Sequence, residues 1–135
     1  MDPAAYLPGS WRVERSLHDA AAGDGRFDGT ATFAPTPEGL RWTERGRLRL
    51  GSYDGPASRE LRIVAAADGW EVRFADGRPF HRLELGRRPA AVEHLCGADR
   101  YTGELMVEGD DAFVVRWRVR GPAKDQRLAG RYIRE

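Results

Sequence analysis

Apolar and charged residues alternate with a period of two along most of this chain. In GLRWTERGRLRL (39–50), Trp42 and Leu48 share one face and arginines fill the other. The same alternation runs through GRFDGTATF (25–33) and AFVVRWRVR (112–120). Because successive side chains of a β-strand point to opposite faces, this pattern predicts half-buried strands.

Short turn signals rich in Gly, Pro and Asp separate the apolar runs. They lie at residues 21–25, 35–39, 53–56, 67–69, 75–79, 86–89, 97–99, 108–111 and 121–125. This spacing indicates about ten strands joined by tight hairpins, with no convincing helix beyond the first ten residues. Closure removes exposed sheet edges, and consecutive hairpins favour up-and-down order. We therefore expect one all-β domain over residues 1–135, a single up-and-down antiparallel β-barrel with a short N-terminal segment closing one end.

Composition excludes several classes of protein. The chain has 22 basic and 21 acidic residues without a basic block, so no nucleic-acid binding is expected. It has no apolar run long enough to span a membrane, and no membrane partner is expected. A single cysteine excludes an internal disulfide, and the N-terminal segment lacks the pattern of a signal peptide. Cytoplasmic residence follows as the expectation, and either a monomer or a homodimer fits the composition.

The two ends of the chain resemble the calycin group, which includes lipocalins, fatty-acid-binding proteins and nitrobindins. Gly9, Ser10 and Trp11 open the first expected strand, and arginines lie in GRYIRE at the other end. In that group the tryptophan closes one end of the barrel, and an arginine stacks on it. The resemblance implies this role for Trp11, with Arg131 as the expected partner and Arg134 as the alternative.

A closer resemblance covers essentially the whole sequence. The segments LPGSWRVER, WTERG, FADGRPFH, HLCGADRYTG and WRVRGPAKD together are similar to an uncharacterised bacterial family, DUF6314. That family often has tyrosine at the position of Trp42 and an aromatic residue at that of Gln126, and these departures affect the shape of a pocket. The resemblance implies a calycin-like, lipocalin-like barrel and implies no activity.

Several ionisable residues share the apolar faces of the expected strands. They are Arg15, Glu44, Arg59, His81 and His94, with Cys96 on the same face as His94. An isolated buried charge costs several kcal/mol, so these groups are expected to be paired or in contact with water. The obvious partner of Glu44 is Arg15 or Arg59. A bulge that turns a charge out to solvent, or an internal network without a ligand, would explain the same pattern.

A polar-lined lumen favours a small-molecule-binding barrel whose ligand is partly apolar with an acidic or polar head. Arginine offers a planar fork of donors that fits a carboxylate or phosphate, and Phe27, Phe33, Trp42 and Trp117 would form an aromatic wall. The expected ligand-binding residues are Arg15, Trp42, Glu44, Arg59, His81, His94, Cys96, Tyr101 and Trp117.

Alternative functions use the same pocket. A cofactor-independent acid/base enzyme of isomerase, cyclase or dehydratase type would employ His81, His94, Tyr101 or Glu44 as catalytic residues. A haem-binding, nitrobindin-like protein would use one of the two histidines, although no cofactor is the expectation. His94-x-Cys96 matches no common zinc spacing, so no metal is expected. A barrel filled by its own side chains would instead be an interaction module, and the sequence does not decide whether any reaction is catalysed.

Overall fold

Ten strands follow one short helix in the computed structural model, which describes residues 1–135. The elements are α1 (Pro3–Tyr6), β1 (Gly9–Asp19), β2 (Gly23–Thr36), β3 (Gly39–Leu50), β4 (Tyr53–Ala66), β5 (Gly69–Phe74), β6 (Pro79–Leu83), β7 (Ala90–Cys96), β8 (Asp99–Gly109), β9 (Ala112–Arg120) and β10 (Asp125–Arg134). The expected all-β, up-and-down architecture is confirmed. The structure has no helix of the length and apolarity that crossing a membrane requires.

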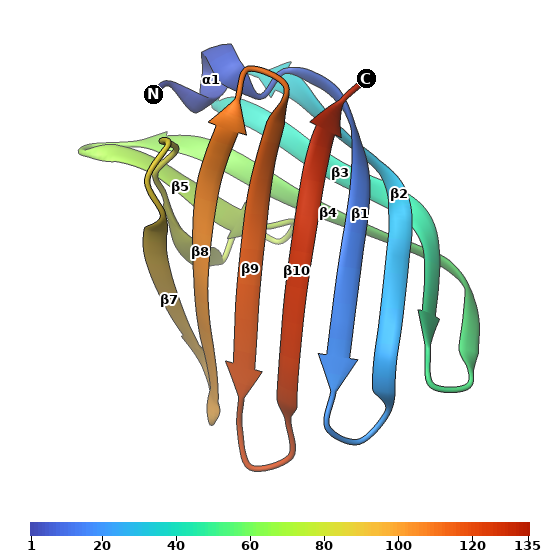
Figure 1. Ribbon diagram of the computed structural model, residues 1–135. Helices are drawn as coiled ribbons and strands as arrows, with labels where there is room; N and C mark the ends of the chain where they lie inside the picture. The colour runs from blue at the N-terminus through green and yellow to red at the C-terminus, as the bar shows by residue number, and fades with distance from the viewer.

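The strands form one antiparallel sheet in the order β6-β5-β4-β3-β2-β1-β10-β9-β8-β7. The first and last strands pair with each other, from Trp11 opposite Arg134 to Asp19 opposite Gln126. The sheet curls into a nearly closed barrel, with α1 and both chain termini at the same end (Figure 1). The opposite end carries the hairpins β1–β2, β3–β4 and β9–β10.

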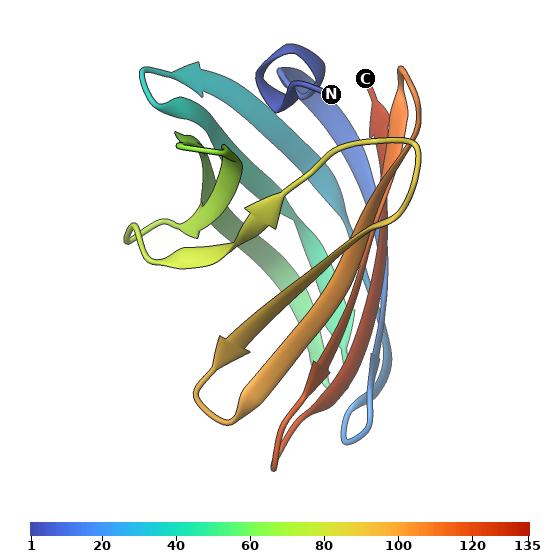
Figure 2. The ribbon, with the colours of Figure 1, turned by 90° about the vertical axis from the view of Figure 1, so that its left-hand side faces the viewer.

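The wall is not closed by hydrogen bonds between β6 and β7. These strands are the two ends of the sheet, and they run at an angle to each other in Figure 2. β6 has five residues, and its pairing with β5 shifts at a bulge between Val72 and Arg73. Aromatic rings bridge the seam instead, with the ring centres of Phe80 and His94 5.2 Å apart. Full closure by strand pairing is therefore not reached on this side.

One turn lies earlier than the sequence predicts. The turn expected at residues 53–56 falls instead at Gly51 and Ser52, and Tyr53 already begins β4. Gly51 adopts a φ of 59°, the left-handed conformation that glycine takes at the lowest steric cost. Gly51 thus provides the tight turn, and Pro56 lies within β4 opposite Arg47.

Trp11 closes the barrel end next to the termini, and its partner is Arg134. The Arg134 guanidinium carbon lies 4.1 Å from the centre of the Trp11 ring. The expected pairing with Arg131 is wrong, because alternation along β10 turns Arg131 to the outer face, where it pairs with Glu108. Arg134, the alternative partner that the sequence offered, is the arginine that stacks on Trp11.

Helix α1 forms the lid over this end. The Trp11 indole donates a hydrogen bond of 2.9 Å to the Leu7 carbonyl, and the Tyr6 hydroxyl donates one of 2.7 Å to the Gly109 carbonyl. Below the lid, Phe113 stacks on Tyr132 with ring centres 4.4 Å apart. This half of the barrel is filled by its own side chains, so any space for a ligand must lie nearer the other end.

Candidate functional site

Glu44 is a carboxylate buried inside the barrel, with a side chain 1% exposed. The alternation of β3 turns it inward, on the same face as Trp42. In the pairing of β3 with β4, Glu44 lies directly opposite Arg59. Arg15 reaches the same carboxylate from β1. The sequence prediction that Glu44 pairs with Arg15 or Arg59 is confirmed, and it pairs with both.

The Glu44 carboxylate accepts hydrogen bonds on both oxygens. Its Oε1 accepts from Arg15 Nη2 at 2.9 Å and from Arg59 Nε at 3.0 Å. Its Oε2 accepts from Arg59 Nη2 at 3.3 Å, from Trp42 Nε1 at 3.0 Å and from the Tyr132 hydroxyl. Arg15 Nη2 also donates to the Tyr132 oxygen at 2.8 Å. We call these five residues the Glu44 network.

Electrostatics keep the Glu44 network charged. Burial would raise the pKa of Glu44, but the guanidiniums of Arg59 and Arg15 and the hydrogen bond from Tyr132 lower it to about 2. Burial and the neighbouring Glu44 raise the pKa of the Tyr132 hydroxyl. At neutral pH the network therefore contains two cations, one anion and a neutral phenol. Both guanidiniums share one carboxylate, so the network keeps a net charge of about +1.

A cavity of about 160 Å³ lies beside the Glu44 network. Arg15, Glu44 and Arg59 form its polar side, and its apolar wall consists of Leu17, Phe27, Leu48, Ala57 and Leu128. The Arg15 side chain is 13% exposed and that of Arg59 is 41% exposed. Each guanidinium uses only some of its donors, since Arg15 Nε and Nη1 and Arg59 Nη1 bond to no acceptor within the chain.

Aromatic rings hold the two arginines in place. The Arg15 guanidinium carbon lies 5.1 Å from the centre of the Phe27 ring, and that of Arg59 lies 5.3 Å from the centre of the Trp42 ring. Cation–π contacts of this kind orient a guanidinium without using its hydrogen-bond donors. The free donors of the cavity therefore have fixed positions before any ligand arrives.

The remaining predicted site residues gather elsewhere, along the β6–β7 seam. Phe80 stacks on Trp117 with ring centres 5.3 Å apart, and it meets the edges of His81, His94 and Tyr101. These rings pack on one another and fill the space between the strands. The structure thus divides the predicted site into the Glu44 network and this seam cluster, and neither His81 nor His94 lines the cavity.

His81 is buried in the seam cluster as a neutral side chain. Burial lowers its pKa, and the nearby His94 and Arg59 act in the same direction, against a hydrogen bond of 2.6 Å between Nδ1 and the Arg82 carbonyl. Because that carbonyl accepts, Nδ1 carries the proton. Phe80 contacts both imidazole rings edge to face. His81 is therefore a packing residue in this arrangement.

The state of His81 gives the protein a pH-dependent stability. Its folded pKa lies below the ordinary value of 6.5, so the unfolded chain binds the proton first as the pH falls. Stability is expected to decrease from pH 7.5 to 5.5, and His81→Gln is expected to reduce that decrease in urea titrations. His18→Gln, which replaces the exposed partner of Asp24, is the control and should show a decrease at least as large as that of the wild type. An unchanged pH dependence in His81→Gln would show that His81 does not titrate in this way.

Cys96 does not take part in either group. It is exposed at the end of β7, next to the turn that leads to Asp99. The predicted hairpin is present, but at the tip of a hairpin the inner face of a strand is no longer covered by the barrel. Cys96 therefore lies apart from both groups, and its contact with a ligand stays a prediction. The structure contains no group of three or more His, Cys, Asp or Glu side chains arranged to hold a metal ion.

Sequence reasoning missed Tyr132, which completes the Glu44 network. Its position in GRYIRE gave a signal, because it lies two residues before Arg134, the alternative partner of Trp11, and therefore shares the inner face of β10 with it. Leu17 and Leu128, opposite each other on β1 and β10, were also not predicted as cavity walls. Their role depends on strand register, which alternation alone does not provide.

Comparisons with known proteins agree with this fold. The family model described as a family of unknown function, DUF6314, matches residues 7–134. No curated protein matches the sequence. The S-type phycobiliprotein lyase CPES from Guillardia theta has a similar structure, with a TM-score of 0.67 and 10% identity over 98% of this chain and 90% of its own.

Two designed proteins share the architecture as well. A fluorescence-activating β-barrel designed de novo has a TM-score of 0.51 and 21% identity over 100% of this chain and 99% of its own. The redesigned barrel mFAP1, bound to DFHBI, has a TM-score of 0.53 and 17% identity over 99% of this chain and 100% of its own. At sequence identities of 10%, 21% and 17%, the similarity to these three proteins is a similarity of fold alone.

Proposed function

This chain belongs to DUF6314, a family of unknown function, and we propose that it binds a small anion with an apolar body in the cavity beside Arg15 and Arg59. The anionic head would contact the two guanidiniums. The apolar body would lie against Leu17, Phe27 and Leu128.

The observation that carries this proposal is the charge of the Glu44 network. Two guanidiniums share one carboxylate, so one positive charge remains beside an apolar cavity. Removing an excess charge from water is unfavourable, and the Arg15 side chain is only 13% exposed, although that of Arg59 is 41% exposed. A neutral pair of one arginine and one glutamate would satisfy the same interior. An anionic ligand would neutralise the second guanidinium through the donors that have no partner in the chain.

The size of the cavity limits the ligand. A volume of about 160 Å³ is below the range of about 300–1,000 Å³ that encloses drug-sized molecules. The head and the first part of the body would fit inside, and a longer body would extend out of the cavity. The designed barrel mFAP1, which is bound to DFHBI, supports the idea that a barrel of this architecture can hold a small molecule.

Acid/base catalysis and haem binding, the two alternative functions considered from the sequence, have weaker support. With both oxygens occupied and a pKa of about 2, Glu44 has no proton to exchange near neutral pH. His81 is surrounded by Phe80 and Trp117, and its Nδ1 is bonded to a carbonyl. The rings that fill the space beside it do not fit a haem. We therefore favour binding over acid/base catalysis or haem ligation.

Calorimetric titration with matched ligands tests the proposal. Benzoate and hexanoate are the anionic probes, and benzamide and hexanamide are their uncharged counterparts. We expect the two carboxylates to bind with dissociation constants on the order of 1 mM or tighter, and the amides at least about tenfold more weakly, since only the anions neutralise the free guanidinium.

The variant Arg59→Gln is expected to weaken carboxylate binding by at least about tenfold. Arg41→Gln is the matched control, because Arg41 lies on the outer face and pairs with Glu60 at 3.6 Å. The control should bind as the wild type does. Equal affinity for acid and amide, or equal affinity in Arg59→Gln and Arg41→Gln, would refute the proposed site.

A further inference from the structure

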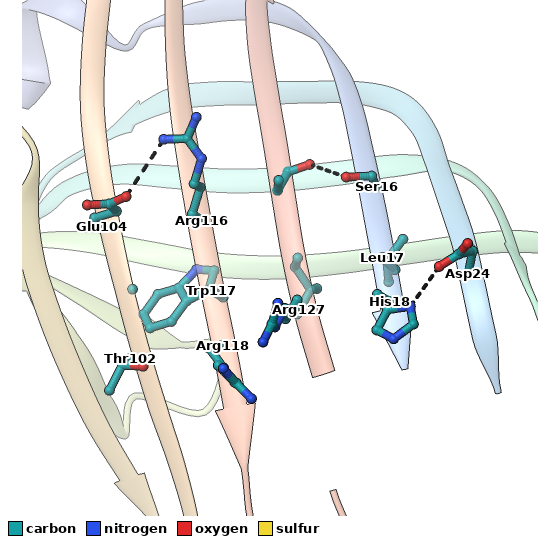
Figure 3. Close-up of a pocket in the computed structure, with 14 residues that line it drawn as sticks. Ser16, Leu17, His18, Asp24, Thr102, Glu104, Arg116, Trp117, Arg118 and Arg127 are labelled. Atoms are coloured by element: carbon teal, nitrogen blue, oxygen red, sulfur yellow. Dashed lines mark hydrogen bonds and ion pairs between the residues drawn. The ribbon is translucent and has the colours of Figure 1, made fainter. Parts of the chain in front are cut away.

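A hollow of about 770 Å³ lies on the outer face of the barrel, across strands β8, β9, β10, β1 and β2 (Figure 3). Most of its lining residues face outward and form two rows that follow the strand register, and the inward-facing Leu17, Gly25, Gly103, Trp117 and Leu128 contribute between them. One row runs Glu104, Arg116, Ala129, Ser16, and the other runs Thr102, Arg118, Arg127, His18, Asp24. Ser16 and Ala129, in the middle of the first row, have small side chains, so the surface is hollowed there. We call this hollow the outer groove.

Like charges face each other in the centre of the outer groove. Arg118 and Arg127 are direct cross-strand partners on β9 and β10, and the next residue in the row is His18. Side chains in such pairs lie about 5 Å apart at Cβ, so two cations there destabilise the sheet unless an anion joins them. No carboxylate lies within 4.0 Å of the Arg127 guanidinium. Asp125 contacts Arg118 at 3.4 Å, so the pair has one carboxylate for two cations, and Arg127 is the one without an acid partner.

A second observation shows that Arg118 is incompletely paired, although neighbouring atoms cover its Nε, so an anion in the groove would reach this atom only if the side chain moved. Arg118 Nε is buried and has no hydrogen-bond partner, the one such side-chain atom in the structure. Buried donors are almost always paired, and each exception calls for an explanation. Arg118 uses its Nη2 for a contact of 3.4 Å with Asp125, which leaves Nε free.

The acids of the outer groove are engaged at its two ends. Glu104 lies 3.7 Å from Arg116, and Asp24 lies 2.7 Å from His18. Neither pairs with Arg127 or Arg118. A smaller hollow of about 350 Å³ adjoins the groove and is lined by Arg26, Arg116 and Arg131. Glu14 and Glu108 also line this hollow, and its three arginines pair with Asp28, Glu104 and Glu108, so the arginine without an acid partner is the central Arg127.

We propose that the outer groove binds the phosphate group of a small phosphorylated molecule between Arg118 and Arg127. A phosphate monoester carries a charge of about −1.5 to −2 and three acceptor oxygens, which suits two guanidiniums on adjacent strands better than a single carboxylate does. Arginine matches phosphate geometry through its planar fork of donors. The volume of the groove lies within the range of small-ligand sites, which leaves room for the rest of the molecule.

Titration with inorganic phosphate and phenyl phosphate, at constant ionic strength set with sodium chloride, tests this site by NMR. Wild-type protein is expected to show saturable shifts of the amide signals of β9 and β10, and Arg127→Gln should weaken the affinity at least tenfold. Arg45→Gln is the matched control, because Arg45 is also an outward arginine without an acid partner, but its strand neighbours are Thr30 and Ser58. It should bind as the wild type does.

Thermal unfolding adds a readout that distinguishes a missing counter-anion from an ordinary surface arginine. Without phosphate, Arg127→Gln is expected to melt at the same or a higher temperature than the wild type, because it removes a repulsion. Addition of phosphate should raise the melting temperature of the wild type by more than that of the variant. Equal gains in wild type, Arg127→Gln and Arg45→Gln would mean a general salt effect and would overturn the site.

Two further experiments distinguish phosphate binding in the outer groove from anion binding in the lumen and from binding to a lipid surface. In Arg59→Gln, titration with inorganic phosphate, which has no apolar body for the lumen, should shift the amide signals of β9 and β10 as it does in the wild type. Loss of those shifts would place the phosphate in the lumen and overturn the outer site. Vesicles of phosphatidylglycerol and phosphatidylcholine test a lipid surface. Binding to vesicles without binding of phenyl phosphate would overturn the small-molecule assignment.

Discussion

Replacing Glu44 by glutamine is expected to lower the free energy of unfolding by about 3 kcal/mol at pH 7. Glutamine keeps the shape of the side chain but removes the one negative charge that two guanidiniums share. It also places an amide where the carboxylate accepts from Arg15, Arg59, Trp42 and Tyr132, so at least one donor would face a donor. Urea unfolding followed by tryptophan fluorescence measures the loss.

The same interaction predicts how wild-type stability depends on pH. The pKa of Glu44 is about 2 in the folded protein, against 4.5 ordinarily, so the stabilisation is complete above about pH 4.5 and is lost as the pH falls towards 2. A difference of this size corresponds to about 3 kcal/mol. Glu44→Gln should lack this loss, while Glu60→Gln, at an outer-face pair with Arg41, should retain it. If Glu44→Gln and wild type lost the same stability in acid, Glu44 would not be the ionised centre of the network.

Trp11→Ala is expected to cost about 3–5 kcal/mol, the range for removing a large buried aromatic side chain. Trp11 is fully buried, and its ring centre lies 4.9 Å from that of Phe113. The indole also anchors α1 through the Leu7 carbonyl. Denaturant unfolding should show the loss, and limited proteolysis should cleave the first ten residues sooner than in the wild type.

A matched pair of arginine variants separates stacking at the lid from the general effect of losing an arginine. Arg134→Gln is expected to destabilise by about 1–2 kcal/mol, since it removes a cation–π contact and hydrogen bonds to the Tyr6 and Pro8 carbonyls. Arg131→Gln, whose exposed pair with Glu108 contributes little, should change stability by less than about 0.5 kcal/mol. The reverse order would contradict the assignment of Arg134 as the closing residue.

The architecture could be predicted from the sequence because its strands are long and half-buried. Where one face of a strand meets the core and the other meets water, alternation identifies both the strand and its inner face. Residues 25–33, 39–50 and 112–120 all follow this rule. The β6–β7 seam did not follow from the sequence, because β6 is short and bulged and its contacts are made by rings rather than by a ladder.

The site was predicted in part for the same reason. The alternation of inward and outward residues placed Arg15, Glu44 and Arg59 inside the barrel. Their contact with one another depends on the strand register, which sets Glu44 opposite Arg59. Register also decides that His81 and His94 lie beyond the cavity, in the seam cluster. Cys96 has the alternation of an inner-face residue, but it lies at the exposed tip of its hairpin, where the barrel does not cover that face. The outer groove was not predicted, since it depends on which outward arginines become neighbours across strands.

The central claim is that the guanidiniums of Arg15 and Arg59 receive an anionic head inside the barrel. Two-dimensional NMR of the arginine Nε–Hε groups during a titration with benzoate tests it most directly. We expect saturable shifts of the Arg15 and Arg59 signals, with the outer-face Arg41 signal unchanged and no shifts upon titration with benzamide. Shifts confined to outer-face arginines, or none at all at millimolar benzoate, would contradict the claim.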